Sequence, residues 1–158
     1  MVHSVAFNTE YEDMVAYSGA STLSIRTGSF KPYRQRMNGL VVAFQGAKVH
    51  CLKNMGMQEE DVPLSSTVQH YIEAKQWEHA YSIACLGVTH DDWNLLGHAA
   101  LMDLQLETAR HAFVRTQDLL MLNLVHRMDI LSQSGVMEDA LKAEVLAHQV
   151  HSVFSPWH

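Results

Sequence analysis

The chain has 158 residues, of which 47% are hydrophobic, and a formal net charge of −6. This apolar content excludes a wholly disordered chain, and the negative charge gives no electrostatic reason to expect a nucleic-acid partner. The N-terminal residues lack the pattern of a signal peptide, and the longest apolar-rich run, at 119–125, is too short for membrane insertion. Two cysteines do not form a disulfide framework, which favours a cytoplasmic location.

Residues 1–63 predict antiparallel β-strands. Five short apolar runs, rich in β-branched and aromatic residues, lie at 3–8, 13–18, 22–27, 40–45 and 47–53. Short strands at this spacing, separated by turn residues, are typical of a sandwich, barrel or propeller. The pairs Asn38-Gly39 and Gly46-Ala47 predict tight hairpins.

Helices are predicted from residue 64 onward, where proline is absent until Pro156 and only three glycines occur. Ser66 followed by Gln69, and Thr89 followed by Asp92, resemble helix-starting capping boxes. Gly87 is expected to end a helix in a left-handed conformation. The predicted helices cover 67–76, 77–86, 90–104, 107–117, 119–134 and 137–151.

The helical region contains an internal repeat. WEHAYSIA, starting at Trp77, aligns with LETARHAF, starting at Leu106, at an offset of 29 residues, and the alanines Ala80 and Ala109 coincide. MEDALKAE, starting at Met137, aligns less well at a further 31 residues. Periods near this length with paired helices predict a tetratricopeptide-like α-hairpin solenoid, in which a small residue lets two helices approach closely.

The stretch YSIACLGVTHDDW at 81–93 has the residue types of a thiol or metal site, but its spacing favours a helical corner. Cys85 falls on an apolar helical stripe with Trp77 and Tyr81, so we expect it to be buried as a small hydrophobe. Large aromatic residues are interpreted as helix-packing anchors, with a partner-binding surface as the alternative. The expected structural or interaction anchors are Trp77, Ala80, Tyr81, Cys85, Gly87, Trp93, Ala109 and Phe113.

No catalytic, cofactor-binding or metal residue is assigned. Asp91 and Asp92 fit the first turn of a helix, where carboxylates are stabilised by the helix dipole. His148 and His151 have metal-ligand spacing but lack further ligands except His158. His50 and Cys51 are neighbours in a strand and point to opposite faces. Phosphate loops, dinucleotide fingerprints and nucleophile elbows are missing from the sequence, so no cofactor and no small-molecule substrate are expected.

Three stretches, VAFNTEYEDMVAYSG, ACLGVTHDDW and ETARHAFVRTQDL, closely resemble the intraflagellar transport protein 122 family, WD-repeat subunits of intraflagellar transport complex A. The resemblance covers about Val5 to Gln149. It implies a β-then-α fold: the terminal antiparallel strands of a WD40-type β-propeller, an acidic linker QEEDVP, and then a tetratricopeptide-like solenoid. The expected domains are 1–63 for the propeller strands, 64–149 for the helical repeats and 150–158 for a divergent tail.

The resemblance also implies a function. It is that of a non-catalytic scaffold in retrograde ciliary transport, cilium assembly and delivery of membrane receptors to cilia, located in the cytoplasm, cilium and ciliary base. The implied partners are the other complex A subunits. The alternatives are a propeller-plus-solenoid subunit of a vesicle coat and, more remotely, a thiol- or metal-dependent enzyme using Cys85. Because the sequence departs from the family after Gln149, we expect a truncated product that is poorly soluble in isolation.

Overall fold

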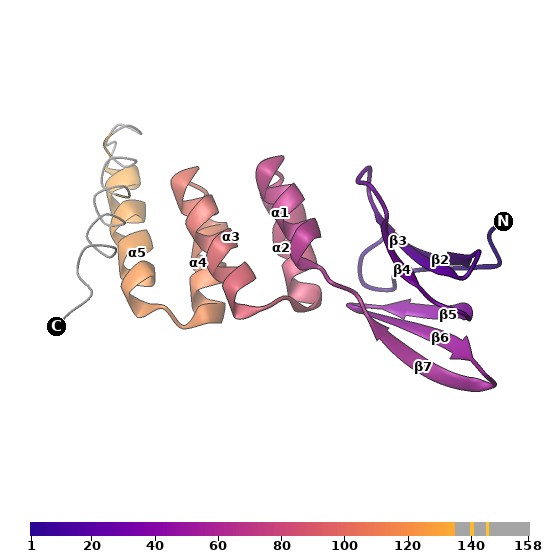
Figure 1. The fold of residues 1–158 in the computed structure, drawn as a ribbon. Coiled ribbons are helices and arrows are strands. Elements are labelled where there is room, and N and C mark those ends of the chain that lie inside the picture. The colour runs from indigo at the N-terminus through magenta and orange to yellow at the C-terminus, as the bar shows by residue number, and fades with distance from the viewer. Residues whose placement is uncertain (135–139, 141–144, 146–158) are drawn as a thin grey trace. The chain divides into compact units, whose positions relative to one another are not determined.

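The computed structural model describes residues 1–134, 140 and 145 of the chain. These residues form two compact units (Figure 1). The first comprises Met1–Thr67 with Ser82–Val88, and the second comprises Val68–Tyr81 with the chain from Thr89 onward. The predicted helix at 137–151, apart from residues 140 and 145, and the tail at 150–158 lie outside the described residues.

Two antiparallel sheets make up most of the first unit. The four-stranded sheet A has the order β1 (Ser4–Phe7), β2 (Met14–Gly19), β3 (Thr22–Thr27), β4 (Tyr33–Arg36). The three-stranded sheet B has the order β5 (Leu40–Gln45), β6 (Lys48–Lys53), β7 (Gly56–Asp61). The predicted fold class, antiparallel strands followed by helices, is confirmed.

The two sheets pack together because the apolar strands of each sheet alternate buried residues onto one face. On β2 and β3 the buried residues include Met14, Ala16, Leu23 and Ile25, and β1 and β2 both contact β5. Sheet B contributes a second set of fully or nearly fully buried side chains, which are Val41, Phe44, Val49 and Cys51. The prediction that Cys51 shares the face of Val49 is therefore confirmed.

Buried polar side chains join sheet A to sheet B. Asn8, which is 6% exposed, donates through Nδ2 to the carbonyl oxygen of Gly46 at 2.7 Å, and its Oδ1 accepts from the backbone N–H groups of Glu10 and Tyr11. Near the other end of β1, the Ser4 hydroxyl accepts a hydrogen bond from the backbone N–H of Val41 at 2.7 Å. These hydrogen bonds fix the position of sheet A relative to sheet B.

Two strands, β4 and β7, were not predicted from the sequence, because both are polar. The predicted acidic linker is wrong, since most of it belongs to β7, which pairs with β6 along its whole length. Ion pairs from Lys48 to Glu59, at 2.9 Å, and from Lys53 to Glu60 support this pairing. The hydrogen bond from Lys48 lowers the pKa of the Glu59 carboxyl and raises the pKa of Lys48 itself.

One of the two predicted hairpins is confirmed. Gly46-Ala47 connects β5 to β6, with Gly46 at a φ of 53°. The prediction for Asn38-Gly39 is wrong, because this pair connects β4 of sheet A to β5 of sheet B and the two strands do not pair with each other. Turn residues alone do not reveal whether the flanking strands belong to one sheet.

The hairpin between β6 and β7 has an unfavourable residue in its turn. Asn54 and Met55 have φ values of 47° and 66°, the left-handed region that a two-residue hairpin requires and that glycine adopts without a Cβ penalty. We expect Met55→Gly to stabilise sheet B by about 0.5–1 kcal/mol, seen as slower amide exchange in β6 and β7. Met57→Gly, within β7, is the control and is expected to speed exchange. Faster exchange in Met55→Gly would contradict this turn geometry.

In the described part of the chain, five helices follow the strands, close to the predicted positions. They are α1 (Ser65–Glu73), α2 (Trp77–Gly87), α3 (His90–Met102), α4 (Leu106–Thr116) and α5 (Leu119–Gln133). The capping box at Thr89 is confirmed: its hydroxyl accepts from the N–H of Asp92, and the Asp92 carboxylate accepts from the N–H of Thr89. The predicted cap at Ser66 is wrong, because α1 already begins at Ser65.

The 29-residue repeat of the sequence is matched by the backbone of two turns, one between α1 and α2 and the other between α3 and α4. Lys75 and Leu104, 29 positions apart, have φ values of 56° and 58°. The next residue in each turn, Gln76 or Gln105, donates its N–H to the carbonyl five residues before it, and its own carbonyl accepts from Ala80 or Ala109. Two helical hairpins of one design therefore succeed each other along the chain.

The third sequence match is placed less well. An offset of 31 residues makes Ala140 the equivalent of Ala109, but Ala140 is exposed whereas Ala80 and Ala109 are both fully buried. Val145, in contrast, belongs to the same buried cluster as Phe113 and Leu124. The predicted register of the third match is therefore wrong at Ala140.

Candidate interaction surface

The predicted anchors of the second hairpin lie inside it. Phe113 and Ala109 on α4 are fully buried with Ala100 and Leu101 of α3, and residues of α5 close the same cluster. Trp77, in the first turn of α2, is half-buried and packs against this cluster. Ala80 is fully buried as well. These residues hold helices in place and present little surface to a ligand.

A close approach between α3 and α4 depends on Gly97. A Cβ atom at this position would lie 2.9 Å from Cε1 of the fully buried Phe113 and 3.2 Å from Cβ of Ala112. We expect Gly97→Ala to destabilise the helical unit by about 1 kcal/mol, because overpacking outweighs the gain in helix propensity. The check is urea unfolding followed by circular dichroism at 222 nm. Adding Phe113→Leu is expected to recover part of the loss, and a stabilising Gly97→Ala would contradict the close packing.

Gly87 is the last residue of α2 and has a φ of +131°, a conformation that other residues rarely adopt. This positive φ differs from the left-handed value near +57° expected from the sequence. A Cβ atom here would lie 3.7 Å from the Cβ of Ala47 in the same unit. Backbone conformation, and not crowding, therefore accounts for glycine at this corner.

The prediction that Cys85 is buried is wrong. The buried residues of α2 are Ala80, Ile83 and Ala84, and Cys85 is exposed. Each helical residue advances by about 100°, so a stripe centred on Ile83 and Ala84 turns Cys85 toward solvent. The sequence contained a signal for this face in Ile83, which the predicted stripe omitted.

The two cysteines are expected to differ in reactivity toward a thiol reagent. Cys51 has no exposed surface, and burial raises the pKa of its thiol, which disfavours the reactive thiolate. In the folded chain at mildly alkaline pH, the exposed Cys85 should therefore react quickly, and the buried Cys51 should react only on unfolding. Cys85→Ser should remove the fast phase and Cys51→Ser should leave it. Two fast thiols in the wild type would contradict the packing of sheet A on sheet B.

A row of side chains in contact with one another joins α2, α3 and α4 within the second unit. Tyr81 on α2 contacts the edge of Trp93 on α3, with ring centroids 5.8 Å apart, and contacts His111 on α4 at 5.3 Å. The Arg115 guanidinium lies over the Trp93 ring at 5.7 Å from its centroid. We call Tyr81, Trp93, His111 and Arg115 the aromatic–arginine row. Tyr81 and Trp93 were predicted as anchors from the sequence, whereas His111 and Arg115 were not, because their proximity depends on how α4 packs.

The polar residues of the 81–93 stretch serve the start of α3. Asp92 is 7% exposed and is bound within the capping box. The His90 ring nitrogen Nε2 lies 3.3 Å from the carbonyl oxygen of Thr116, and Nδ1 lies 3.1 Å from Asn94 Nδ2. Within the described residues, no group of three or more potential metal-ligating side chains occurs. His148, His151 and His158 lie outside those residues.

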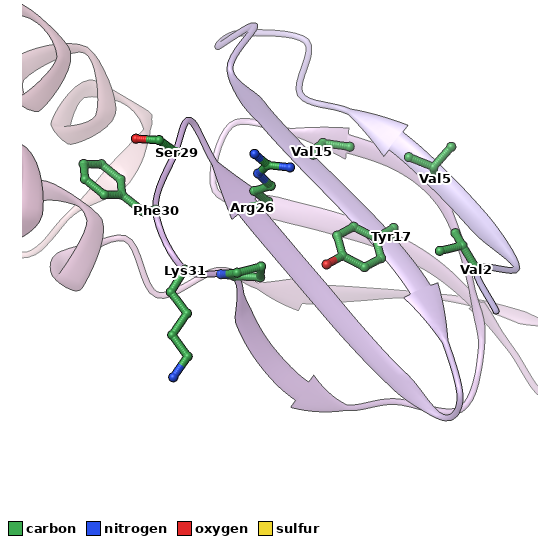
Figure 2. A pocket seen from close by; sticks show the side chains of 9 residues that line it. Val2, Val5, Val15, Tyr17, Arg26, Ser29, Phe30 and Lys31 are labelled. Carbon is green, nitrogen blue, oxygen red and sulfur yellow. The ribbon is translucent and has the colours of Figure 1, made fainter.

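The strand unit has an open groove on the face of sheet A that is turned away from sheet B (Figure 2). Apolar side chains from β1 and β2, including Val5, Val15 and Tyr17, form its floor (Figure 2). Arg26, the register partner of Val15, and Lys31 also line it, and the Arg26 Nε donates to the carbonyl oxygen of Gly28. The lining contains no carboxylate, histidine or cysteine, so it offers no paired acid and base or activated nucleophile. The groove is best described as an uncovered apolar sheet face.

No helix in the described part of the chain is both long and apolar enough to span a membrane. The described structure thus consists of stacked antiparallel sheets followed by repeated α-hairpins. This arrangement defines the class of proteins in which β-propeller sheets precede a helical-repeat region.

Comparison with known proteins identifies the family within this class. The family model described as the IFT122 second beta-propeller matches residues 1–57. Over 148 residues, 93% of this chain, the sequence is 40% identical to intraflagellar transport protein 122 homologs of Mus musculus and Xenopus tropicalis, and 39% identical to that of Homo sapiens. The chain therefore belongs to the intraflagellar transport protein 122 family. It spans 12% of the length of these relatives.

Proposed function

We propose that the chain forms part of a non-catalytic scaffold subunit of intraflagellar transport complex A. The observation that carries this proposal is the 40% identity to an intraflagellar transport protein across 93% of the chain, which includes both the sheets and the helical hairpins. As such a subunit it acts in retrograde ciliary transport, cilium assembly and delivery of membrane receptors to cilia. Its location is the cytoplasm, the ciliary base and the cilium, and its partners are other complex A subunits.

The two regions of the chain have different roles in this scheme. Residues 1–63 supply propeller strands, and further sheets of the longer protein cover the exposed apolar side chains of sheets A and B, such as Phe7 (69% exposed) and Val42 (53% exposed). Residues 64–149 begin a solenoid whose hairpins offer side surfaces to other subunits. No catalytic, cofactor-binding or metal residue is assigned to either region.

The order of propeller sheets and helical hairpins also favours a second candidate, a subunit of a vesicle coat. The two functions are separated by isolating the tagged full-length protein from ciliated cells and identifying co-purifying proteins by mass spectrometry. We expect complex A subunits in stoichiometric amounts and vesicle-coat subunits at background level. The reverse result would overturn the proposal in favour of the coat.

A further inference from the structure

Arg115 in the aromatic–arginine row is an exposed cation without a carboxylate partner in the described structure. Two other basic side chains in the described part of the helical unit are paired with carboxylates: Lys75 lies 2.7 Å from Asp103, and Arg110 lies 3.2 Å from Asp129. Arg115 instead has the Trp93 ring, 5.7 Å away, as its contact. Because a contact with a ring is not a hydrogen bond to a carboxylate, it leaves guanidinium N–H groups available to an acceptor.

The row holds Arg115 in a defined position. Trp93 is only 8% exposed, and its ring also contacts the ring of Tyr81. Tyr81 in turn contacts His111. The ring beneath Arg115 is thus immobilised by packing between α2, α3 and α4. Such preorganisation reduces the conformational entropy lost when a partner binds the guanidinium.

The composition around Arg115 is that of a protein-binding surface. Tryptophan, tyrosine and arginine are the residues most enriched among those whose replacement by alanine strongly weakens protein–protein binding. Val114, three positions after His111 of the row and therefore on a neighbouring part of the same α4 surface, is 56% exposed and adds apolar area. A guanidinium beside apolar and aromatic surface fits a segment that carries a carboxylate next to an apolar side chain.

We propose that the aromatic–arginine row and Val114 form a docking surface for an acidic segment of another subunit of the same complex, with a carboxylate of that segment bound by Arg115. This inference rests on the proposed function, because it places the partner in complex A. Acidic residues outnumber basic ones in the described helices, so a partner carboxylate is disfavoured at most positions on this unit and favoured beside Arg115. This contrast in charge directs the partner's carboxylate to Arg115 and away from other positions on the unit.

The test uses the full-length protein co-expressed with the complex A subunits, with recovery of each subunit on the tagged protein measured at several salt concentrations. We expect Arg115→Glu to weaken retention of one subunit by roughly tenfold or more. Arg115→Lys, which keeps the charge and loses the planar fork, should have a smaller effect. Arg127→Glu on α5 is the matched control, because it makes the same change in charge away from the row, and it should retain all subunits.

The outcomes separate the two levels of the proposal. If the wild-type protein retains no complex A subunit, the proposed function itself fails. If the wild type retains them and Arg115→Glu does so equally well, the complex stands and the docking surface is overturned. Equal loss in Arg115→Glu and Arg127→Glu would also overturn it, because the effect would then reflect charge alone. Circular dichroism of each variant at 222 nm ensures that folded proteins are compared.

Discussion

Replacing Phe113 with alanine is expected to lower the free energy of unfolding of the helical unit by about 3–5 kcal/mol. The Phe113 side chain is fully buried where α3, α4 and α5 meet, and its ring lies against Gly97 and the edge of His98. Its removal leaves a cavity that neighbouring helices cannot fill without giving up their own contacts. Urea unfolding followed at 222 nm measures the change.

The matched control for this substitution is the neighbouring residue. Val114 is 56% exposed, so Val114→Ala should change the free energy of unfolding by less than about 0.5 kcal/mol. Similar small effects of both substitutions would show that α4 does not pack with the face described here.

Replacing Asn8 with alanine is expected to loosen the contact between sheets A and B by about 2–3 kcal/mol. The Asn8 side chain is nearly buried, donates to the carbonyl oxygen of Gly46 and accepts from two backbone N–H groups, and alanine replaces none of these bonds. Hydrogen exchange of β5 and β6 amides reports the change, and we expect rates to rise by roughly 30- to 150-fold.

Two further variants show whether the side-chain amide is responsible. Asn8→Asp keeps the acceptor but loses the donor to Gly46, so it should also speed exchange. Thr9→Ala, at the exposed neighbouring position, should leave exchange in β5 and β6 nearly unchanged. An Asn8→Ala variant with wild-type exchange would contradict the role of this side chain in joining the sheets.

The features that the sequence predicted well depend on local patterns. Helix positions follow from apolar periodicity, and the start of α3 follows from Thr89 and Asp92, whose side chains act within one turn. The 29-residue repeat was visible because Ala80 and Ala109 occupy equivalent buried positions. Such signals need no knowledge of distant parts of the chain.

The features that the sequence did not reveal depend on tertiary contacts. β7 carries Glu59 and Glu60, which suggest a solvated linker until lysines on β6 are seen to pair with them. Cys85 lies on the exposed side of α2 because the buried stripe contains Ile83, whereas the larger Trp77 and Tyr81, which suggest the other side, are only half-buried. His111 and Arg115 join Tyr81 and Trp93 only when α4 is packed beside α3. Side chains from separate elements therefore set the surface that we propose for partner binding.

The most direct test of the account is the movement of transport particles in cilia of cells that lack the full-length protein. Kymographs of a fluorescent transport subunit measure anterograde and retrograde movement separately. We expect retrograde movement to be lost in these cells and the wild-type full-length protein to restore it. Normal retrograde movement in the absence of the protein would contradict a role in intraflagellar transport.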